Sequence, residues 1–266
     1  MPVSDSKGCI IRRSEFAFSS FDWGRVAEPV GPAMGAELVK LNVVEVAPNS
    51  VWRLGWAFEE ENTVVVLEGS GHGDVTGERF ALERKSSLYS PTGRTLELTA
   101  GEGGLTAYVW RTKLQGGEKL GDAPKVSGAL SDDDVQLRGF SGLGDGPAEG
   151  QGAVMNFVFW PGTGSARLCL HCGMQEPGQT FNVHIHPESE EAFIAVEGLG
   201  QLYMHDQWND VTAGDVLFAP PGVPHGARKP ATDEQGEAAA TFVTCGGPTP
   251  FDPALYRAAG VSADVK

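Results

Sequence analysis

The stretch GQTFNVHIHPESEEAFIAVEG, residues 178–198, carries most of the information about the fold and the site. Its short apolar runs, broken by polar residues and bounded by Gly and Pro, are typical of β-strands joined by a turn. On a strand, alternate side chains share a face, so His184 and His186 point the same way, with Cα atoms roughly 6.5–7 Å apart. Glu191 opens the next strand after the turn and can supply a carboxylate beside the two imidazoles.

A third histidine follows in GDVLFAPPGVPHGARK, residues 214–229. His225 comes at the end of a proline-rich turn that restricts its backbone. Three imidazoles and one carboxylate suit Mn, Fe, Ni, Co, Cu or Zn, and they do not suit Ca or Mg. We therefore predict one divalent transition metal as cofactor (Mn, Fe, Ni, Cu or Zn), with four ligands: His184, His186, Glu191 and His225.

The first half of the chain contains an earlier copy of part of this pattern. VLEGSG, residues 66–71, matches AVEGLG, residues 195–200, at an offset of 129 residues (195 minus 66). PTG at 91–93 matches PPG at 220–222 in the same register. A register kept over separated matches indicates that the two halves are copies of one structural unit.

Composition and turn spacing predict an all-β fold. The 266 residues include Gly 36 and Pro 17, and only 21% are charged. Short strands with turn signals about every 8–12 residues are typical of sandwiches and barrels. We expect four segments: an N-terminal unit at 30–114, a linker at 115–152, a C-terminal unit at 153–250, and a short helix and tail at 251–266.

The helix expected near the end rests on three residues. Asp252 is a typical N-cap, Pro253 a typical first helical residue, and Gly260 a typical stop. The run between them, ALYRAA, is compatible with a helix.

The chain is strongly acidic. Its 20 basic and 35 acidic residues give a formal net charge of -15 and a sequence pI of about 4.8. Such a field repels phosphate backbones and anionic lipids, so we expect neither a nucleic-acid partner nor a membrane partner. The sequence also contains no apolar run of membrane-spanning length and no apolar centre of a secretory signal near the start.

The chain has four cysteines, which are Cys9, Cys169, Cys172 and Cys245. Four are too few for a disulfide framework in a chain of this length. The Cys169-x-x-Cys172 spacing lies in a strand-like run, where the two side chains would point to opposite faces. We therefore expect reduced structural thiols and a cytoplasmic location.

The two histidine-bearing stretches resemble the two motifs of the cupin superfamily. The first motif, Gly-x5-His-x-His-x4-Glu-x6-Gly, is complete at Gly178, His184, His186, Glu191 and Gly198. The second, Gly-x5-Pro-x-Gly-x2-His-x3-Asn, is matched at Gly214, Pro220, Gly222 and His225, with Lys229 in place of the asparagine. With the repeat, the resemblance implies a bicupin, which is two jelly-roll β-barrels in tandem.

The first unit lacks the metal ligands. At the 129-residue offset, the four ligand positions become Gly55, Ala57, Asn62 and Leu96. The acidic run at 59–61 nearby is typical of a solvated turn. We expect this unit to support the fold and to be available for a homodimer interface.

Strand alternation extends the expected site beyond the ligands. If His184 and His186 face the barrel interior, Asn182 and Thr180 should face it too, and Glu191 should bring Phe193 inside. These three, Thr180, Asn182 and Phe193, are the predicted substrate pocket. His171 and His205 are the predicted groups behind the ligands, or the predicted proton shuttles.

An open position on the metal is typical of a catalytic site. We expect a metal-dependent enzyme that acts on a small-molecule substrate, an oxygenated metabolite, and the cupin-type dioxygenases are the nearest reaction class. The layout is also similar to the ureidoglycine aminohydrolases, which would imply a Mn-dependent hydrolase or lyase. That family tends to have glutamine where this chain has His225. A non-enzymatic cupin that binds a small molecule is the third interpretation.

Overall fold

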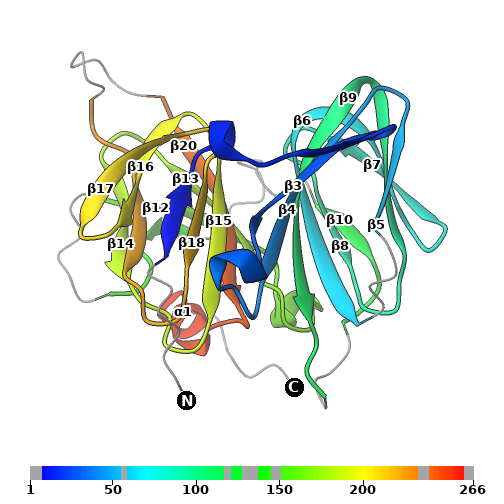
Figure 1. Cartoon of the computed structure of the whole chain (residues 1–266). Coiled ribbons are helices and arrows are strands. Elements are labelled where there is room, and N and C mark those ends of the chain that lie inside the picture. The colour runs from blue at the N-terminus through cyan, green and yellow to red at the C-terminus, as the bar shows by residue number, and fades with distance from the viewer. Residues whose placement is uncertain are drawn as a thin grey trace. The chain divides into compact units, whose positions relative to one another are not determined.

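The computed structural model describes residues 8–54, 59–116, 121–127, 137–144, 151–232 and 240–260. These residues form two units built from strands, each with its own apolar core (Figure 1). The N-terminal unit comprises residues 16–131 and 158–170, and the C-terminal unit comprises residues 1–15, 132–157 and 171–266. The predicted all-β fold with two barrel units is confirmed.

The N-terminal unit is built from nine described strands and two short 3-10 helices. The strands are β2 (Ser19–Phe21), β3 (Gly24–Val30), β4 (Lys40–Val46), β5 (Val51–Leu54), β6 (Glu60–Val75), β7 (Glu78–Glu83), β8 (Ser87–Ser90), β9 (Leu96–Lys113) and β10 (Lys125–Ser127). The helices are η2 (Pro32–Met34) and η4 (Pro161–Thr163). The sheet order is β10-β8-β6-β9-β4-β3-β2, with β5 on β9 and β7 on β6.

The long strands β6 and β9 bend and so serve both layers of this unit. The first part of β6 pairs with β8, and the part after the bend pairs with β7. Gly69 lies at the bend with φ 80, and a Cβ there would meet the Gly104 oxygen at 2.1 Å. Only glycine fits such a close approach in this conformation. The layers enclose a core that includes Val64, Val66 and Leu98.

The C-terminal unit repeats this plan with more strands. They are β1 (Cys9–Ile11), β11 (Leu137–Phe140), β12 (Gln151–Phe159), β13 (Leu170–Gln175), β14 (Gln179–His184), β15 (Glu190–Glu197), β16 (Leu199–Met204), β17 (Gln207–Thr212), β18 (Val216–Ala219), β19 (His225–Arg228) and β20 (Phe242–Thr249). The helices are η1 (Arg13–Glu15) and α1 (Pro253–Ala258). The order is β1-β18-β15-β20-β13-β12-β14-β19-β16-β17, with β11 on β12.

Gly198 shows why the Glu-Gly pair of the sequence repeat occurs in both units. It lies between β15 and β16 with φ 77, and a Cβ there would meet the Thr241 oxygen at 2.2 Å. Gly69 in the other unit has the same conformation and the same kind of backbone contact. The Glu-Gly pair repeated in the sequence therefore marks the bend that each barrel requires.

The beginning of the chain belongs to the C-terminal unit. Strand β1 pairs antiparallel with β18, with Cys9 opposite Phe218. Arg12 Nη1 then lies 3.0 Å from Asp215 Oδ2, and the Arg13 N–H donates to Asp215 Oδ1 at 2.9 Å. The sequence contains no signal for this pairing, because a three-residue strand carries too little periodicity to be recognised.

The segment predicted as a linker contains two strands. Within residues 115–152, β10 pairs with β8 and β11 pairs with β12. The other parts of this segment, at 117–120, 128–136 and 145–150, lie outside the described residues. So do Gly55 and Ala57, two of the four positions at which the first unit was expected to lack ligands.

The structure corrects the prediction of four reduced thiols. Cys172 on β13 and Cys245 on β20 form a disulfide and lie directly opposite each other, with Cα atoms 4.3 Å apart. Cys9 and Cys169 are not part of a disulfide. Spacing along the chain could not reveal the pair, because a sequence separation of 73 gives no information on which strands become neighbours.

The acidic run at 59–61 is not a solvated turn throughout. Glu61 is fully buried, and it accepts hydrogen bonds from Tyr89 Oη at 2.8 Å and from the N–H groups of three successive residues, Ala166, Arg167 and Leu168. Burial raises the pKa of Glu61, and these donors oppose that shift. This carboxylate thereby joins two distant segments of the N-terminal unit.

Helix α1 begins at Pro253, and the Asp252 side chain caps it by accepting from the Ala254 N–H at 2.8 Å. Gly260 follows in the left-handed region with φ 75. No helix in the described part of the chain has the length and apolar character needed to cross a membrane.

Candidate metal centre

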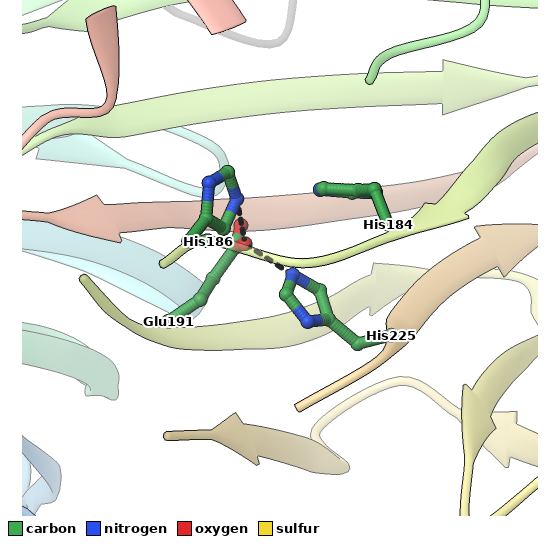
Figure 2. Close-up of side chains that lie close together, drawn as sticks. All are labelled: His184, His186, Glu191 and His225. Carbon is green, nitrogen blue, oxygen red and sulfur yellow. Dashed lines mark hydrogen bonds and ion pairs between the residues drawn. The ribbon is translucent and has the colours of Figure 1, made fainter. Parts of the chain in front are cut away.

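Four side chains from three strands and one turn converge inside the C-terminal unit (Figure 2). His184 ends β14 and lies opposite His225, the first residue of β19. His186 follows two residues later, and Glu191 comes from β15. One potential ligand atom from each of the four lies within 4.8 Å of the others.

The proline-rich turn is tied to the first histidine pair by the backbone. The Gly222 N–H donates to the His186 carbonyl at 2.8 Å, and the Val223 N–H donates to the Pro220 carbonyl at 3.1 Å. These bonds fix the turn against His186, so His225, which follows the turn, lies at a defined distance from His186. The two ring centroids are 5.3 Å apart.

Glu191 lies at the centre of the group. Its Oε2 is 2.7 Å from His225 Nε2 and 2.9 Å from His186 Nε2 (Figure 2). The contact with His186 is short but its direction does not make a hydrogen bond, so His186 Nε2 is buried without a hydrogen-bond partner. A buried nitrogen that points at a carboxylate without bonding to it is the arrangement expected of two ligands that share an ion.

In each of the three histidines, Nδ1 has a hydrogen-bond acceptor that is not one of the four converging side chains. Nδ1 of His184 donates to the Asn182 carbonyl at 2.7 Å, and Nδ1 of His225 donates to the Val223 carbonyl at 2.8 Å. Nδ1 of His186 donates to Asp252 Oδ2 at 2.8 Å. Carbonyl and carboxylate oxygens only accept, so they hold Nδ1 as the N–H and leave Nε2 available for a metal.

These residues fit a divalent transition metal. Imidazole and carboxylate bind such ions at about 2.0–2.2 Å, so two ligands of one ion are at most about 4.4 Å apart. The observed spread of 4.8 Å is close to that limit. Four protein donors also leave coordination positions open on an ion that takes five or six ligands, so the site can bind a substrate as well as the ion.

The ionisable groups of the site are strongly coupled. Burial opposes a charge on His186, but its hydrogen bond to Asp252 and the nearby carboxylate of Glu191 outweigh that effect and raise its pKa to about 9. Burial lowers the pKa of His184 to about 3, and the neighbouring His225 adds to that shift. Burial would raise the pKa of Glu191, yet His186 and His225 hold it well below its usual range. At neutral pH, a metal must therefore displace a proton from His186.

A small cavity opens directly onto the four side chains. Its volume is about 60 Å³, against about 300–1,000 Å³ for pockets that take drug-sized ligands. Besides the four, it is lined by Gly142, Met155, His171, Gly173, Phe181, Phe193, Gly226, Ala227, Thr244, Gly246 and Leu255. The walls are mainly apolar, and none of these described lining residues is Lys or Arg.

The comparisons with known proteins agree with this geometry. The model of the cupin domain family matches residues 174–242, which include all four converging side chains. Residues 174–242 of the C-terminal unit are therefore similar to a cupin domain. No curated protein matches the chain in sequence.

Solved structures share the fold of this chain over nearly its whole length. Protein Ylba from E. coli has a TM-score of 0.67 and 14% identity, over 94% of this chain and 94% of that one. A putative glyoxylate-induced protein from Pseudomonas aeruginosa has a TM-score of 0.67 and 16% identity, over 91% and 90%. Oxalate decarboxylase from Bacillus subtilis, studied for its Mn(II) centres, has a TM-score of 0.63 and 13% identity, over 95% and 78%.

The cupin cavity contains some of the predicted pocket residues and excludes others. Phe193 and His171 line it, whereas Thr180 and Asn182 are not among its described lining residues. The reason is a bulge in β14: Phe181 pairs with Ala227 and His184 with His225, so β14 takes three steps where β19 takes two. The extra residue shifts the alternation by one, and Phe181 replaces Asn182 at the cavity.

His205 does not reach the described part of the cupin cavity. It is exposed in the turn between β16 and β17, with φ 54, and the following Asp206 has φ 60. The prediction had rested on its nearness in sequence to the motifs. A hairpin carries its turn residues away from the barrel interior, so nearness in sequence was misleading.

Sequence reasoning missed three cavity or support residues on the last helix. Asp252 was recognised as a helix cap, but its bond to His186 was not foreseen. Leu255 lines the cavity, and Tyr256 is buried with its hydroxyl against His171 Nε2. Their spacing fits one helical face, but no pattern in the sequence shows which surface that face packs against.

Proposed function

We propose that this protein is a metal-dependent enzyme that acts on a small oxygenated metabolite through dioxygenase-type chemistry. The observation that carries the proposal is that all four candidate ligands line one cavity. A purely structural site would surround the ion with protein on every side. Here there is space for a substrate next to the ion.

The cavity also favours a particular kind of substrate. Its small volume suits a compact molecule, and the absence of Lys and Arg from the described lining leaves the ion as the main positive charge. We infer that the substrate binds through adjacent oxygens on the metal. Its carbon atoms would contact Phe181, Phe193 and Met155.

The residues around the ion have distinct tasks in this proposal. His184, His186, Glu191 and His225 would hold it, and Asp252 would keep the His186 ring in the required tautomer. When bound, the ion would supply the Lewis acidity that activates substrate oxygens or binds O2 beside them. The apolar wall limits the access of water to the bound substrate.

Metal analysis and oxygen uptake test the proposal together. The purified protein, loaded with Fe(II), Mn(II), Ni(II) or Cu(II), is offered small diketones, catechols and flavonols in an oxygen electrode. We expect one ion per chain and O2 consumption with at least one substrate. The His186→Ala variant should lose both, and the control His205→Ala, which changes an exposed histidine, should retain both. No retained metal in the wild-type protein would refute the proposal.

A hydrolase or lyase that does not use O2 is the second candidate. It is favoured by the partial sequence resemblance of this chain to the ureidoglycine aminohydrolases. The test is ammonia release from ureidoglycine by the Mn(II)-loaded protein. Ammonia release without oxygen uptake would select this candidate over the dioxygenase.

Three further expectations remain predictions. A cupin that binds a small molecule without converting it would retain the metal and bind ligands in the absence of any turnover. The cytoplasmic location can be checked by cell fractionation, and the homodimer by light scattering of the purified chain. None of these results would alter the assignment of the four metal ligands.

A further inference from the structure

We propose that His171 binds the substrate beside the metal site and that Tyr256 is its positioning residue. This inference rests on the proposed function, because it assigns a second attachment point to a ligand held by the ion. His171 lines the same cavity but is not one of the four candidate ligands.

The placement of His171 supports a contact with the substrate. It lies on β13 and is buried, yet it lines the same cavity as His184, His186, Glu191 and His225. Among the described residues, its ring makes one hydrogen bond, between Nε2 and the Tyr256 hydroxyl. Because Nε2 is bonded to Tyr256, Nδ1 is the ring nitrogen left to meet a ligand in the cavity that His171 lines.

The ring of His171 is held rigidly. The Phe157 ring packs edge-on against it with centroids 4.7 Å apart, and the Tyr256 ring does so at 5.4 Å. Both aromatic residues are buried. A ring fixed on two sides loses little further freedom when it binds a ligand, which favours affinity.

The hydrogen bond to Tyr256 lets His171 offer either a donor or an acceptor to the cavity. Burial lowers the pKa of His171 to about 3, so the ring is neutral at ordinary pH. If Tyr256 donates to Nε2, then Nδ1 carries the hydrogen and can donate to a substrate oxygen. If Tyr256 accepts, Nδ1 can accept from a substrate hydroxyl.

Helix α1 links this second attachment point to the metal site. Asp252 at its start binds His186, Leu255 lines the cavity, and Tyr256 binds His171. The approach to the helix is held by Ser189, whose Oγ donates to the Pro250 carbonyl at 2.6 Å. A single six-residue helix therefore orients one metal ligand and one cavity histidine.

The geometry points to a substrate with at least three polar atoms. Two oxygens would chelate the ion, and a third atom, a carbonyl, carboxylate or hydroxyl oxygen, would meet His171. Oxalate is a suitable probe because it chelates through two oxygens and leaves two others free. It is used here as a small chelator and not as the substrate.

The test measures oxalate binding to the Co(II)-loaded full chain from changes in the visible spectrum of the ion. We expect His171→Phe to retain one ion per chain and the wild-type spectrum before oxalate is added, but to bind oxalate about tenfold more weakly. Tyr256→Phe should weaken oxalate binding about threefold with the same metal content. His171→Gln, which keeps a donor and an acceptor, should restore part of the affinity.

His205→Gln is the matched control, because it makes the same change at an exposed histidine outside the described cavity lining, and it should bind oxalate as the wild type does. If His171→Phe binds oxalate as tightly as the wild type, the inference is overturned and the metal-dependent function stands. If His171→Phe does not fold, the test rests on His171→Gln and Tyr256→Phe. Wild-type affinity for oxalate in both variants would then overturn the inference. Failure of the wild type to retain Co(II) would instead refute the proposed function itself.

Discussion

Asp252 has two partners, one on each carboxylate oxygen. Its Oδ1 accepts from the Ala254 N–H at the start of α1, and its Oδ2 accepts from His186 Nδ1, both at 2.8 Å. A residue that the sequence identifies only as a helix cap thus supports a candidate metal ligand. Carboxylates in this position fix the orientation of a ligating histidine and direct its other ring nitrogen at the ion.

The first prediction concerns this carboxylate. Asp252→Asn should weaken metal binding by about 10–100-fold, because the amide has one acceptor oxygen for two donors and lacks the charge that strengthens the bond to His186. Competition with a chelator of known affinity measures the change. Asp206→Asn is the matched control: Asp206 lies in an exposed turn, and asparagine tolerates its positive φ. Equal losses in both variants would contradict the assigned role.

The second prediction concerns pH. The pKa of His186 is raised to about 9, so the metal-free site holds a proton that the ion must displace. Apparent metal affinity should therefore rise as pH increases toward 9, by up to about tenfold per pH unit, and level off above it. Calorimetry in buffers of different ionisation enthalpy should show about one proton released per ion at pH 7. An affinity that stays constant between pH 6 and 8 would contradict this account.

At the scale of the elements, β14 shows how a single extra residue in a strand changes which side chains line the cavity. Its bulge between Phe181 and His184 leaves both residues at the cavity, although their positions differ by three. Strict alternation would have paired His184 with Asn182. The sequence predicted this strand correctly. It did not predict the bulge, which turns Phe181 toward the cavity in place of Asn182.

The pairing of β13 with β20 gives the third prediction, because the Cys172–Cys245 disulfide joins two strands that line the cavity on their other face. His171 and Gly173 flank one cysteine, and Thr244 and Gly246 flank the other. Replacing both cysteines by alanine should lower the free energy of unfolding by about 2–4 kcal/mol, because the bond closes a long loop in the unfolded chain.

Urea unfolding with and without a reductant measures this change. The reductant should destabilise the wild type and leave the double alanine variant unaffected. The variant therefore controls for effects of the reductant other than cleavage of this disulfide. An unfolding curve of the wild type that does not respond to complete reduction would contradict a stabilising disulfide.

At the scale of the whole molecule, the two units are not continuous in sequence. The first residues of the chain complete the C-terminal sheet through β1, and residues 158–170 cluster with the N-terminal unit. The domain limits of 30–114 and 153–250 remain predictions, and the described contacts show that each unit uses chain from outside its expected limits.

The fourth prediction follows from β1. Deleting residues 1–13 should destabilise the C-terminal unit by about 2–4 kcal/mol, because it removes a few backbone hydrogen bonds, the partly buried Ile10 and the bonds of Arg12 and Arg13 to Asp215. Urea unfolding gives the free energy, and hydrogen exchange should show faster exchange in β18. Deleting residues 1–7, which leaves β1 intact, is the control and should have little effect.

The sequence by itself determined the all-β fold, the two-unit plan and the four converging side chains. Each depends on short-range rules: strand alternation places His184 and His186 together, and a bend that requires glycine repeats at Gly69 and Gly198. The tertiary structure alone decided the support of His186 by Asp252 and the disulfide of Cys172. These depend on which distant strands and helices become neighbours and in what register, and local periodicity contains no information on either.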